Sequence, residues 1–291
     1  MPFLVLLLIA VGAGLGAAFL TRRYPESAAA APVVEAVREA GEHATGAAGQ
    51  RAVRAARLDP EKATGLALTL ALLVIFVGAV LLALLAVVVR STDALAGIDS
   101  SVANWGDRHG SARTHDALTL VTQLGESWLV ALVAAVVAVV DYLRTRNRWV
   151  APFLIAVILG DKLLTEAVKQ LIDRARPTIE AVAATLGPSF PSGHTSTAAA
   201  SWAAFALVAG RWWGRPSWPA LAGTAVGIAV AVACSRVFLD VHWLTDVLGG
   251  LALGWAWFAA CAIAFGGRVL RFGAVAEAVG RDTLDQRSGV V

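Results

Sequence analysis

Near its C-terminal end, the 291-residue sequence holds a histidine and an aspartate spaced for nucleophilic chemistry. His242 and Asp246 are four positions apart, so a helix would place the carboxylate one turn from the imidazole. The carboxylate could then accept the Nδ1 proton and leave the lone pair of Nε2 free to attack an electrophile. A structural histidine–aspartate hydrogen bond is the alternative. This alternative is less favoured at a membrane boundary, where ionisable groups are energetically costly and usually functional.

A second histidine ends the sequence Pro191-Ser192-Gly193-His194, directly before an apolar stretch. Backbone amides at a helix N-terminus bind anions, and the small Ser-Gly step would let an anion approach them. A histidine at that place can give a proton to the group attached to the anion. A turn followed by a helix cap explains the motif equally well.

Three basic residues complete the set. Lys169 and Arg176 are seven residues apart, so both would project from one face if the helix continues as far as Arg176, and Pro177 would then end it. Arg236 lies six residues before His242. On its own, the Lys169–Arg176 pair also fits side chains that reach for water at a membrane edge.

The composition indicates a membrane protein. Hydrophobic residues make up 58% of the chain, charged residues only 15%, and the mean hydropathy is +0.69. A soluble domain carries about 25% charged residues, so this chain has too little polar surface for a water-soluble globule. The net charge of +3 is too small to indicate a nucleic-acid partner. Cys234 and Cys261 lie in apolar stretches, where neither a disulfide framework nor a cysteine metal site is expected.

Seven apolar stretches are long enough to span a bilayer as helices, for which about 20 residues are needed. They predict an all-α, multi-pass helix bundle with spans at residues 2–20, 66–89, 117–140, 149–171, 194–210, 218–238 and 243–267. The first stretch is interpreted as a retained helix rather than a signal peptide, because Arg22 and Arg23 follow its apolar run instead of preceding it.

The positive-inside rule orients these spans. The Arg-rich loops 141–148 and 211–217 are assigned to the cytoplasm, and loops 90–116 and 172–193 to the outside. The first outer loop carries Asp93, Asp99, Asp107 and Asp116. This topology uses only charge and hydropathy, yet it places all three motifs at the outer face. Three cations, two histidines and a carboxylate on one face describe an anion pocket with a nucleophile and an acid.

The sequence also makes predictions for a short helix in the first outer loop and for the charged residues inside one span. An apolar face with 3-4-3 spacing predicts a short helix on the outer membrane surface, formed by Leu95, Ile98, Val102 and Trp105. Asp161, Lys162 and Glu166 lie well inside the span at 149–171. A charge pair that steadies the helix carrying Lys169 is favoured there over a direct role in substrate binding. His109 and His115 are interpreted as solvated loop residues.

Taken together, the motifs resemble the three signatures of the type 2 phosphatidic acid phosphatase (PAP2) superfamily. They are Lys-x6-Arg-Pro at 169–177, Pro-Ser-Gly-His at 191–194 and Ser-Arg-x5-His-x3-Asp at 235–246. The superfamily includes membrane lipid phosphatases, soluble bacterial acid phosphatases and vanadium haloperoxidases. The resemblance covers a six-span core at 66–267. The extra N-terminal span with its linker, residues 1–65, and a cytoplasmic tail, residues 268–291, lie outside it.

The resemblance implies a role for each matched residue. His242 would attack phosphorus and form a phosphohistidine, oriented by Asp246, while His194 would protonate the leaving group and then activate water. The phosphate oxygens would be held by Lys169, Arg176, Ser192, Gly193 and Arg236. No metal or other cofactor is expected, because three fixed cations supply the stabilisation that a metal clamp would give.

The expected protein is a phosphatase of the cell membrane with its active site on the extracytoplasmic side. Its partner would be a lipid phosphate: a polyprenyl diphosphate such as undecaprenyl diphosphate, phosphatidic acid, or phosphatidylglycerol phosphate. One alternative is an anion or lipid transporter, or a binding scaffold, although such a site needs neither the histidine–aspartate pair nor a second histidine. Another is a haloperoxidase with vanadate in the same pocket, which the membrane context disfavours.

Overall fold

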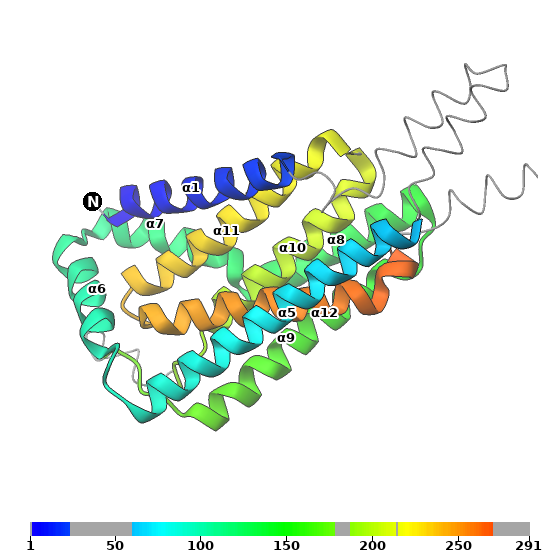
Figure 1. Ribbon diagram of the computed structural model, residues 1–291. Coiled ribbons are helices and arrows are strands. Elements are labelled where there is room, and N and C mark those ends of the chain that lie inside the picture. Colours follow the sequence, from blue (N-terminus) through cyan, green and yellow to red (C-terminus); the bar gives the residue numbers. More distant parts are fainter. Residues whose placement is uncertain (1, 24–59, 178–186, 214, 270–291) are drawn as a thin grey trace, which may run out of the picture.

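The computed structural model describes residues 2–23, 60–177, 187–213 and 215–269. The regular elements in these ranges are all helices, which confirms the predicted fold class (Figure 1). The long helices are α1 (Pro2–Arg23), α5 (Pro60–Ser91), α8 (Ser127–Thr145), α9 (Val150–Ile172), α10 (Gly193–Trp213), α11 (Trp218–Phe238) and α12 (Leu244–Val269). The short ones are α6 (Ala96–His109), α7 (Ala112–Thr122) and the 3-10 turns η1 (Gln123–Gly125) and η3 (Arg215–Ser217). The linker after α1 and nearly all of the predicted tail lie outside the described residues.

Helix α10 is the centre of the bundle and contacts α8, α9, α11 and α12. Its sequence explains this position, because small side chains let neighbouring helices approach closely. The buried small residues of α10 include Ala198, Ala199, Ala200 and Ala204. At the periphery, α1 packs on α11 and α5 packs on α12, while α6 and α7 lie at one end of the bundle (Figure 1).

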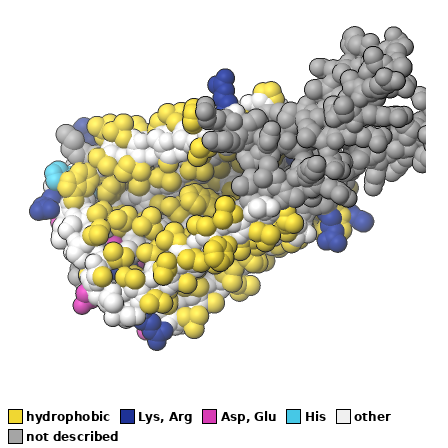
Figure 2. Space-filling model, viewed as in Figure 1, with side chains coloured by type: hydrophobic (Ala, Val, Ile, Leu, Met, Phe, Trp, Pro, Cys, Tyr) yellow, Lys and Arg dark blue, Asp and Glu magenta, His cyan; other side chains and the backbone are white. Residues whose placement is uncertain are grey.

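The outer surface is strongly apolar over the helices that Figure 2 shows. On α5, Phe76 is 67% exposed and Leu84 is 58% exposed, and on α9 Leu163 is 72% exposed. A continuous apolar surface of this kind fits a lipid environment. The helices α1, α5, α8, α11 and α12 are long and apolar enough to span a membrane. The remaining two predicted spans correspond to α9, which carries four charged residues, and to α10, which begins with the polar run Gly-His-Thr-Ser-Thr.

The span predicted at 117–140 is wrong in its start. Helix α7 ends at Thr122, and Glu126 has an extended backbone before α8 begins at Ser127. Hydropathy could not reveal the break, because Leu118 of α7 is apolar but packs inside the protein, with 2% exposure. At the break, a Cβ on Gly125 would lie 2.6 Å from the carbonyl oxygen of His194. This close approach brings the start of α8 against the start of α10.

The short helix predicted at 95–105 is present as α6. The residues that it buries against the protein are Asp99, Ala103 and Gly106, whereas Ile98 of the predicted apolar face is 53% exposed. Asp99, assigned to the acidic outer loop, is only 1% exposed. The helix therefore turns a carboxylate toward the protein, and the reason is a partner charge contributed by the residues after α9.

Helix α1 docks on α11 through glycines, and this contact generates a prediction. A Cβ on Gly14 would lie 2.7 Å from the carbonyl oxygen of Gly223. Gly14→Leu should force the helices apart and lower the free energy of unfolding by about 1–3 kcal/mol, as overpacking does. The matched control is Gly16→Leu, because a Cβ on Gly16 meets no atom within 4 Å. Denaturant unfolding in detergent micelles measures both, and equal stabilities would contradict the contact.

Candidate active site

A cavity of about 230 Å³ lies where the ends of α9, α10 and α11 meet the turn before α12. Six of the residues predicted from the sequence line this cavity: Lys169, Arg176, Gly193, His194, Arg236 and His242. Asp246 does not line it but contacts His242 from behind, and Ser192 lies one residue before the lining. Residues that are far apart in the sequence thus meet at one place.

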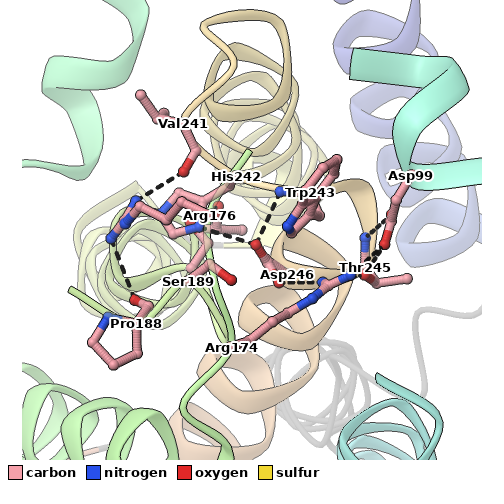
Figure 3. Close-up of polar contacts among 12 residues, drawn as sticks. Asp99, Arg174, Arg176, Pro188, Ser189, Val241, His242, Trp243, Thr245 and Asp246 are labelled. Carbon is pink, nitrogen blue, oxygen red and sulfur yellow. Dashed lines mark hydrogen bonds and ion pairs between the residues drawn. The ribbon is translucent and has the colours of Figure 1, made fainter. Parts of the chain in front are cut away.

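His242 is held in the turn between α11 and α12, with 2% of its surface exposed. Its Nδ1 lies 3.4 Å from Oδ2 of Asp246, in the first turn of α12. On the other side of the ring, Nη1 of Arg176 lies 3.1 Å from Nε2 (Figure 3). These partners fit the tautomer with the proton on Nδ1 and the lone pair on Nε2. Burial lowers the pKa of His242 to about 4 despite the opposing effect of Asp246, so the imidazole is neutral at pH 7.

Asp246 accepts hydrogen bonds from three directions. Besides His242, its carboxylate receives the backbone N–H of Trp243 at 2.9 Å and Nη1 of Arg174 at 2.6 Å (Figure 3). Arg174 in turn donates through Nη2 to Asp99 of α6 at 2.7 Å. Asp99 also accepts from the hydroxyl and the backbone N–H of Thr245. A buried network therefore fixes the carboxylate that faces His242.

Arg174 and Asp99 were not among the site residues predicted from the sequence. Arg174 stands two residues before Arg176 and could have been suspected from that neighbourhood alone. Asp99 offered only a weak signal: it is the acidic residue in the first turn of a short helix. The two residues are 75 positions apart, so no local sequence pattern indicates that they pair.

His194 is the second residue of α10. Its Nε2 lies 2.9 Å from Oε1 of Glu126, the residue before α8. Glu126 is also absent from the predicted site, because hydropathy assigned it to a continuous span. The contact follows from the break before α8, which sets Gly125 against the backbone of His194.

The two arginines at the cavity are held by different hydrogen bonds. Arg176 donates to the carbonyl oxygens of Gly187 and Val241, at 2.9 and 2.8 Å, in addition to its contact with His242. Arg236 donates through Nη1 to Thr122, at 3.2 Å. Its buried Nε has no hydrogen-bond partner among the described residues. Such a donor beside a cavity suits an anionic ligand.

Ser192 and Gly193 differ in their surroundings. Ser192 is fully buried, its backbone N–H donates to the carbonyl of Asp246, and its hydroxyl accepts from Thr195. Gly193 lines the cavity. A Cβ on Gly250 would lie 2.7 Å from the carbonyl oxygen of Ser192, so α12 packs tightly against this motif.

The charge pair expected between Lys162 and Glu166 is not formed. Both side chains are exposed and line the cavity, and Glu166 accepts instead from Gln170. Asp161 is fully buried and accepts from the hydroxyls of Ser196 and Thr197 on α10. Neutral hydroxyls thus connect α9 to α10.

Two further sequence assignments concern possible metal ligands. His109 and His115 are exposed, and His109 stacks on Trp105. Among the described residues, no group of three histidine, cysteine or acidic side chains could hold a metal ion. The charges around the cavity come from side chains of the chain itself.

Known proteins are similar to this chain in sequence and in fold. The model of the PAP2 superfamily matches residues 149–269. Phosphatidylglycerophosphatase B of Bacillus subtilis is 34% identical over 143 residues, which make up 48% of this chain and 70% of that protein. Decaprenylphosphoryl-5-phosphoribose phosphatase of Mycobacterium tuberculosis is 32% identical over 153 residues, or 51% of this chain and 77% of that protein.

A solved structure extends the similarity to three dimensions. The crystal structure of a transmembrane PAP2-type phosphatidylglycerolphosphate phosphatase from Bacillus subtilis superimposes with a TM-score of 0.59 and 25% identity. The match covers 68% of this chain and 96% of that one. Since the chain shares this fold and aligns with more than two thirds of two phosphatases of the family, it belongs to the PAP2 superfamily.

Proposed function

We propose that the chain is an integral-membrane phosphatase that hydrolyses a lipid phosphate at this cavity, through a phosphohistidine on His242 and without a metal ion. The observation that carries the proposal is the meeting of both histidines with the three cations of the motifs, Lys169, Arg176 and Arg236, around one cavity. A site that only bound or escorted an anion would need the cations but neither histidine. The similarity to named phosphatases supports a hydrolytic reaction.

In the proposed first step, Nε2 of His242 attacks phosphorus while the bond from phosphorus to the leaving oxygen breaks. The neutral imidazole supplies the electron pair, and Asp246 stabilises the positive charge that develops on the ring. His194 gives a proton to the leaving oxygen. In the second step, His194 takes a proton from water, whose oxygen attacks phosphorus and breaks the phosphorus–nitrogen bond. Glu126 orients the ring of His194 in both steps.

The phosphate oxygens would be held by Lys169, Arg176 and Arg236. The unpartnered Nε of Arg236 offers one donor, and Arg176 would exchange its contact with Nε2 for a phosphate oxygen when His242 attacks. Gly193 would contribute its backbone amide at the start of α10. Ser192 would contribute its hydroxyl after turning it away from Thr195. These fixed donors stabilise charge on the transferred phosphoryl group, the task that a metal performs elsewhere.

The substrate is proposed to be a lipid because the cavity lies within a bundle with an apolar surface. A phosphatidylglycerol phosphate, a phosphatidic acid and a polyprenyl diphosphate all present a phosphate on a membrane anchor. The catalytic unit is assigned to residues 66–267, since α1 contributes nothing to the cavity lining. The cavity is assigned to the extracytoplasmic face of the cell membrane, opposite the Arg-rich loops.

The two histidines provide the test of mechanism. His242→Ala should abolish lipid turnover and any phosphoenzyme, because the attacking atom is removed. His194→Ala should slow lipid turnover by about 10²–10⁴-fold, the usual effect of losing a general acid. With a nitrophenyl phosphate, whose leaving group needs little protonation, it should accumulate an acid-labile phosphohistidine. Phosphate release and phosphohistidine detection on purified protein with EDTA measure these effects.

Three results would contradict the mechanism. Phosphoenzyme in His242→Ala would move the nucleophile elsewhere, and normal lipid turnover by His194→Ala would remove the general acid. Loss of all activity in EDTA, restored by Mg²⁺, would show that a metal takes part.

The Arg174 network predicts a stability effect. Arg174→Met leaves the carboxylates of Asp99 and Asp246 buried without a cation, so the free energy of unfolding should fall by about 3–5 kcal/mol. Adding Asp99→Asn removes one stranded charge and should recover part of the loss. Denaturant unfolding in detergent compares these with Arg113→Met, the removal of an exposed cation of α7, which should have little effect. Additive losses in the double variant would contradict the network.

Membrane orientation is tested by labelling, in a background where Cys234 and Cys261 are replaced by alanine. Asp107→Cys lies on α6, which contacts α11 and α12 at the cavity end of the bundle. An impermeant maleimide should label it on intact cells. Arg148→Cys, in the Arg-rich loop before α9, should react only after permeabilisation. The reverse pattern would overturn the proposed orientation.

A further inference from the structure

The cavity extends from the cations at the end of α9 toward the middle of that helix. Lys162, Glu166 and Lys169 follow the i, i+4, i+7 spacing of one helix face, and all three line the cavity. At about 1.5 Å per residue, Lys162 lies about 10 Å from Lys169 along the helix axis. With increasing distance from the reacting end, the lining therefore presents a cation, a carboxylate and a second cation.

Thr165 adds a polar atom to the lining. Its side chain lines the cavity and is 5% exposed, yet its buried Oγ1 has no hydrogen-bond partner among the described residues. A Cβ on Gly193 would lie 3.7 Å from Cγ2 of Thr165 and 3.8 Å from Nζ of Lys169, so Thr165 borders the proposed phosphate site. Leaving a buried hydroxyl unpaired costs about 1–3 kcal/mol. A ligand group that pairs with it removes this cost.

Lys162 is too deep in α9 to keep its charge in water at a membrane surface. It lies about 15 Å from the C-terminal end of the helix and about 18 Å from the N-terminal end. Both distances exceed the reach of a lysine side chain, so snorkelling does not explain it. Glu166, one turn away, accepts from Gln170 and lies outside ion-pair distance of Lys162. A lysine at such depth marks a functional site by default, and the cavity is where its charge can meet an anion.

We propose that Lys162, Thr165 and Glu166 form a second subsite, which binds the part of the substrate next to the scissile phosphate. Lys162 pairs with a second anionic group, while Thr165 and Glu166 hydrogen-bond to hydroxyls that lie between the two anions. This inference rests on the proposed function and names its substrate class. That class is lipids whose terminal phosphate is joined to a phosphodiester through a hydroxyl-bearing unit such as glycerol or a sugar.

The order of charges disfavours the other lipid phosphates. In a polyprenyl diphosphate, the second phosphate directly follows the first and would lie beside the Glu166 carboxylate, which repels it. In phosphatidic acid, the phosphate is attached to diacylglycerol, and no second anion reaches Lys162. Phosphatidic acid is thus disfavoured because it leaves Lys162 unpaired, and the polyprenyl diphosphate because Glu166 repels its second phosphate.

The test compares two lipids with the same acyl chains, phosphatidylglycerol phosphate and phosphatidic acid, with the full chain in mixed micelles. Lys162→Met should lower kcat/KM for phosphatidylglycerol phosphate by roughly 10- to 100-fold, the effect of losing a charged hydrogen bond. For phosphatidic acid kcat/KM should stay within about twofold, because that lipid does not use Lys162. Lys162→Arg should restore most of the loss. Arg113→Met, which removes an exposed cation that is not part of the cavity lining, should leave both values unchanged.

Two further variants test the other members of the subsite. Thr165→Val should lower kcat/KM for phosphatidylglycerol phosphate by about 2- to 10-fold. It should not lower the melting temperature, because Oγ1 has no hydrogen-bond partner in the described part of the chain. Glu166→Gln should raise kcat/KM for a polyprenyl diphosphate, since the repelling charge is removed.

The outcomes separate the subsite from the proposed function. An active chain in which Lys162→Met slows both lipids equally, or neither, would overturn the subsite alone. Failure of Thr165→Val to fold would overturn the role of Thr165 in the subsite. An unchanged kcat/KM of Glu166→Gln for the polyprenyl diphosphate would overturn the role of Glu166. A purified chain that hydrolyses none of the three lipids would overturn the proposed function, and the subsite with it.

Discussion

The ion pairs of Arg174 are the interaction on which the geometry of the candidate site depends. One guanidinium bonds Asp246 of α12 at 2.6 Å and Asp99 of α6 at 2.7 Å. Both carboxylates are almost completely buried, and a buried charge without a partner strongly destabilises a protein. Charge compensation therefore requires α6, the segment after α9 and the start of α12 to meet at one point. The position of Asp246, and through it that of His242, follows from this requirement.

Half of the cavity lining could be predicted from the sequence, because those residues sit at or beside helix ends. Hydropathy locates where helices end, and the positive-inside rule assigns those ends to one side of the membrane. Together they placed Lys169, His194, Arg236 and His242 on the same membrane face. The partners of these residues could not be found in this way. Asp99 pairs with a residue 75 positions away, and Glu126 with one 68 positions away, and no local pattern records such contacts.

The two wrong expectations have different physical causes. Spacing along one helix suggested that Lys162 and Glu166 pair, but Glu166 accepts from Gln170 of the same helix. Continuous hydropathy suggested a single span through Glu126, but the break at Gly125 lets α8 approach the backbone of His194. Local rules describe an isolated helix well and a crowded helix junction poorly.

Arg176 shows why charge alone does not define a residue at this site. Its planar fork donates at once to Gly187, Val241 and Nε2 of His242, which fixes its direction before any ligand arrives. A lysine would bring the same charge on a flexible stem with donors that converge on one point, and it could not span these three acceptors. The entropy of ordering this cation is lost during folding rather than during binding. Position 176 is therefore restricted to a single amino acid by geometry, even where the electrostatic potential would accept two.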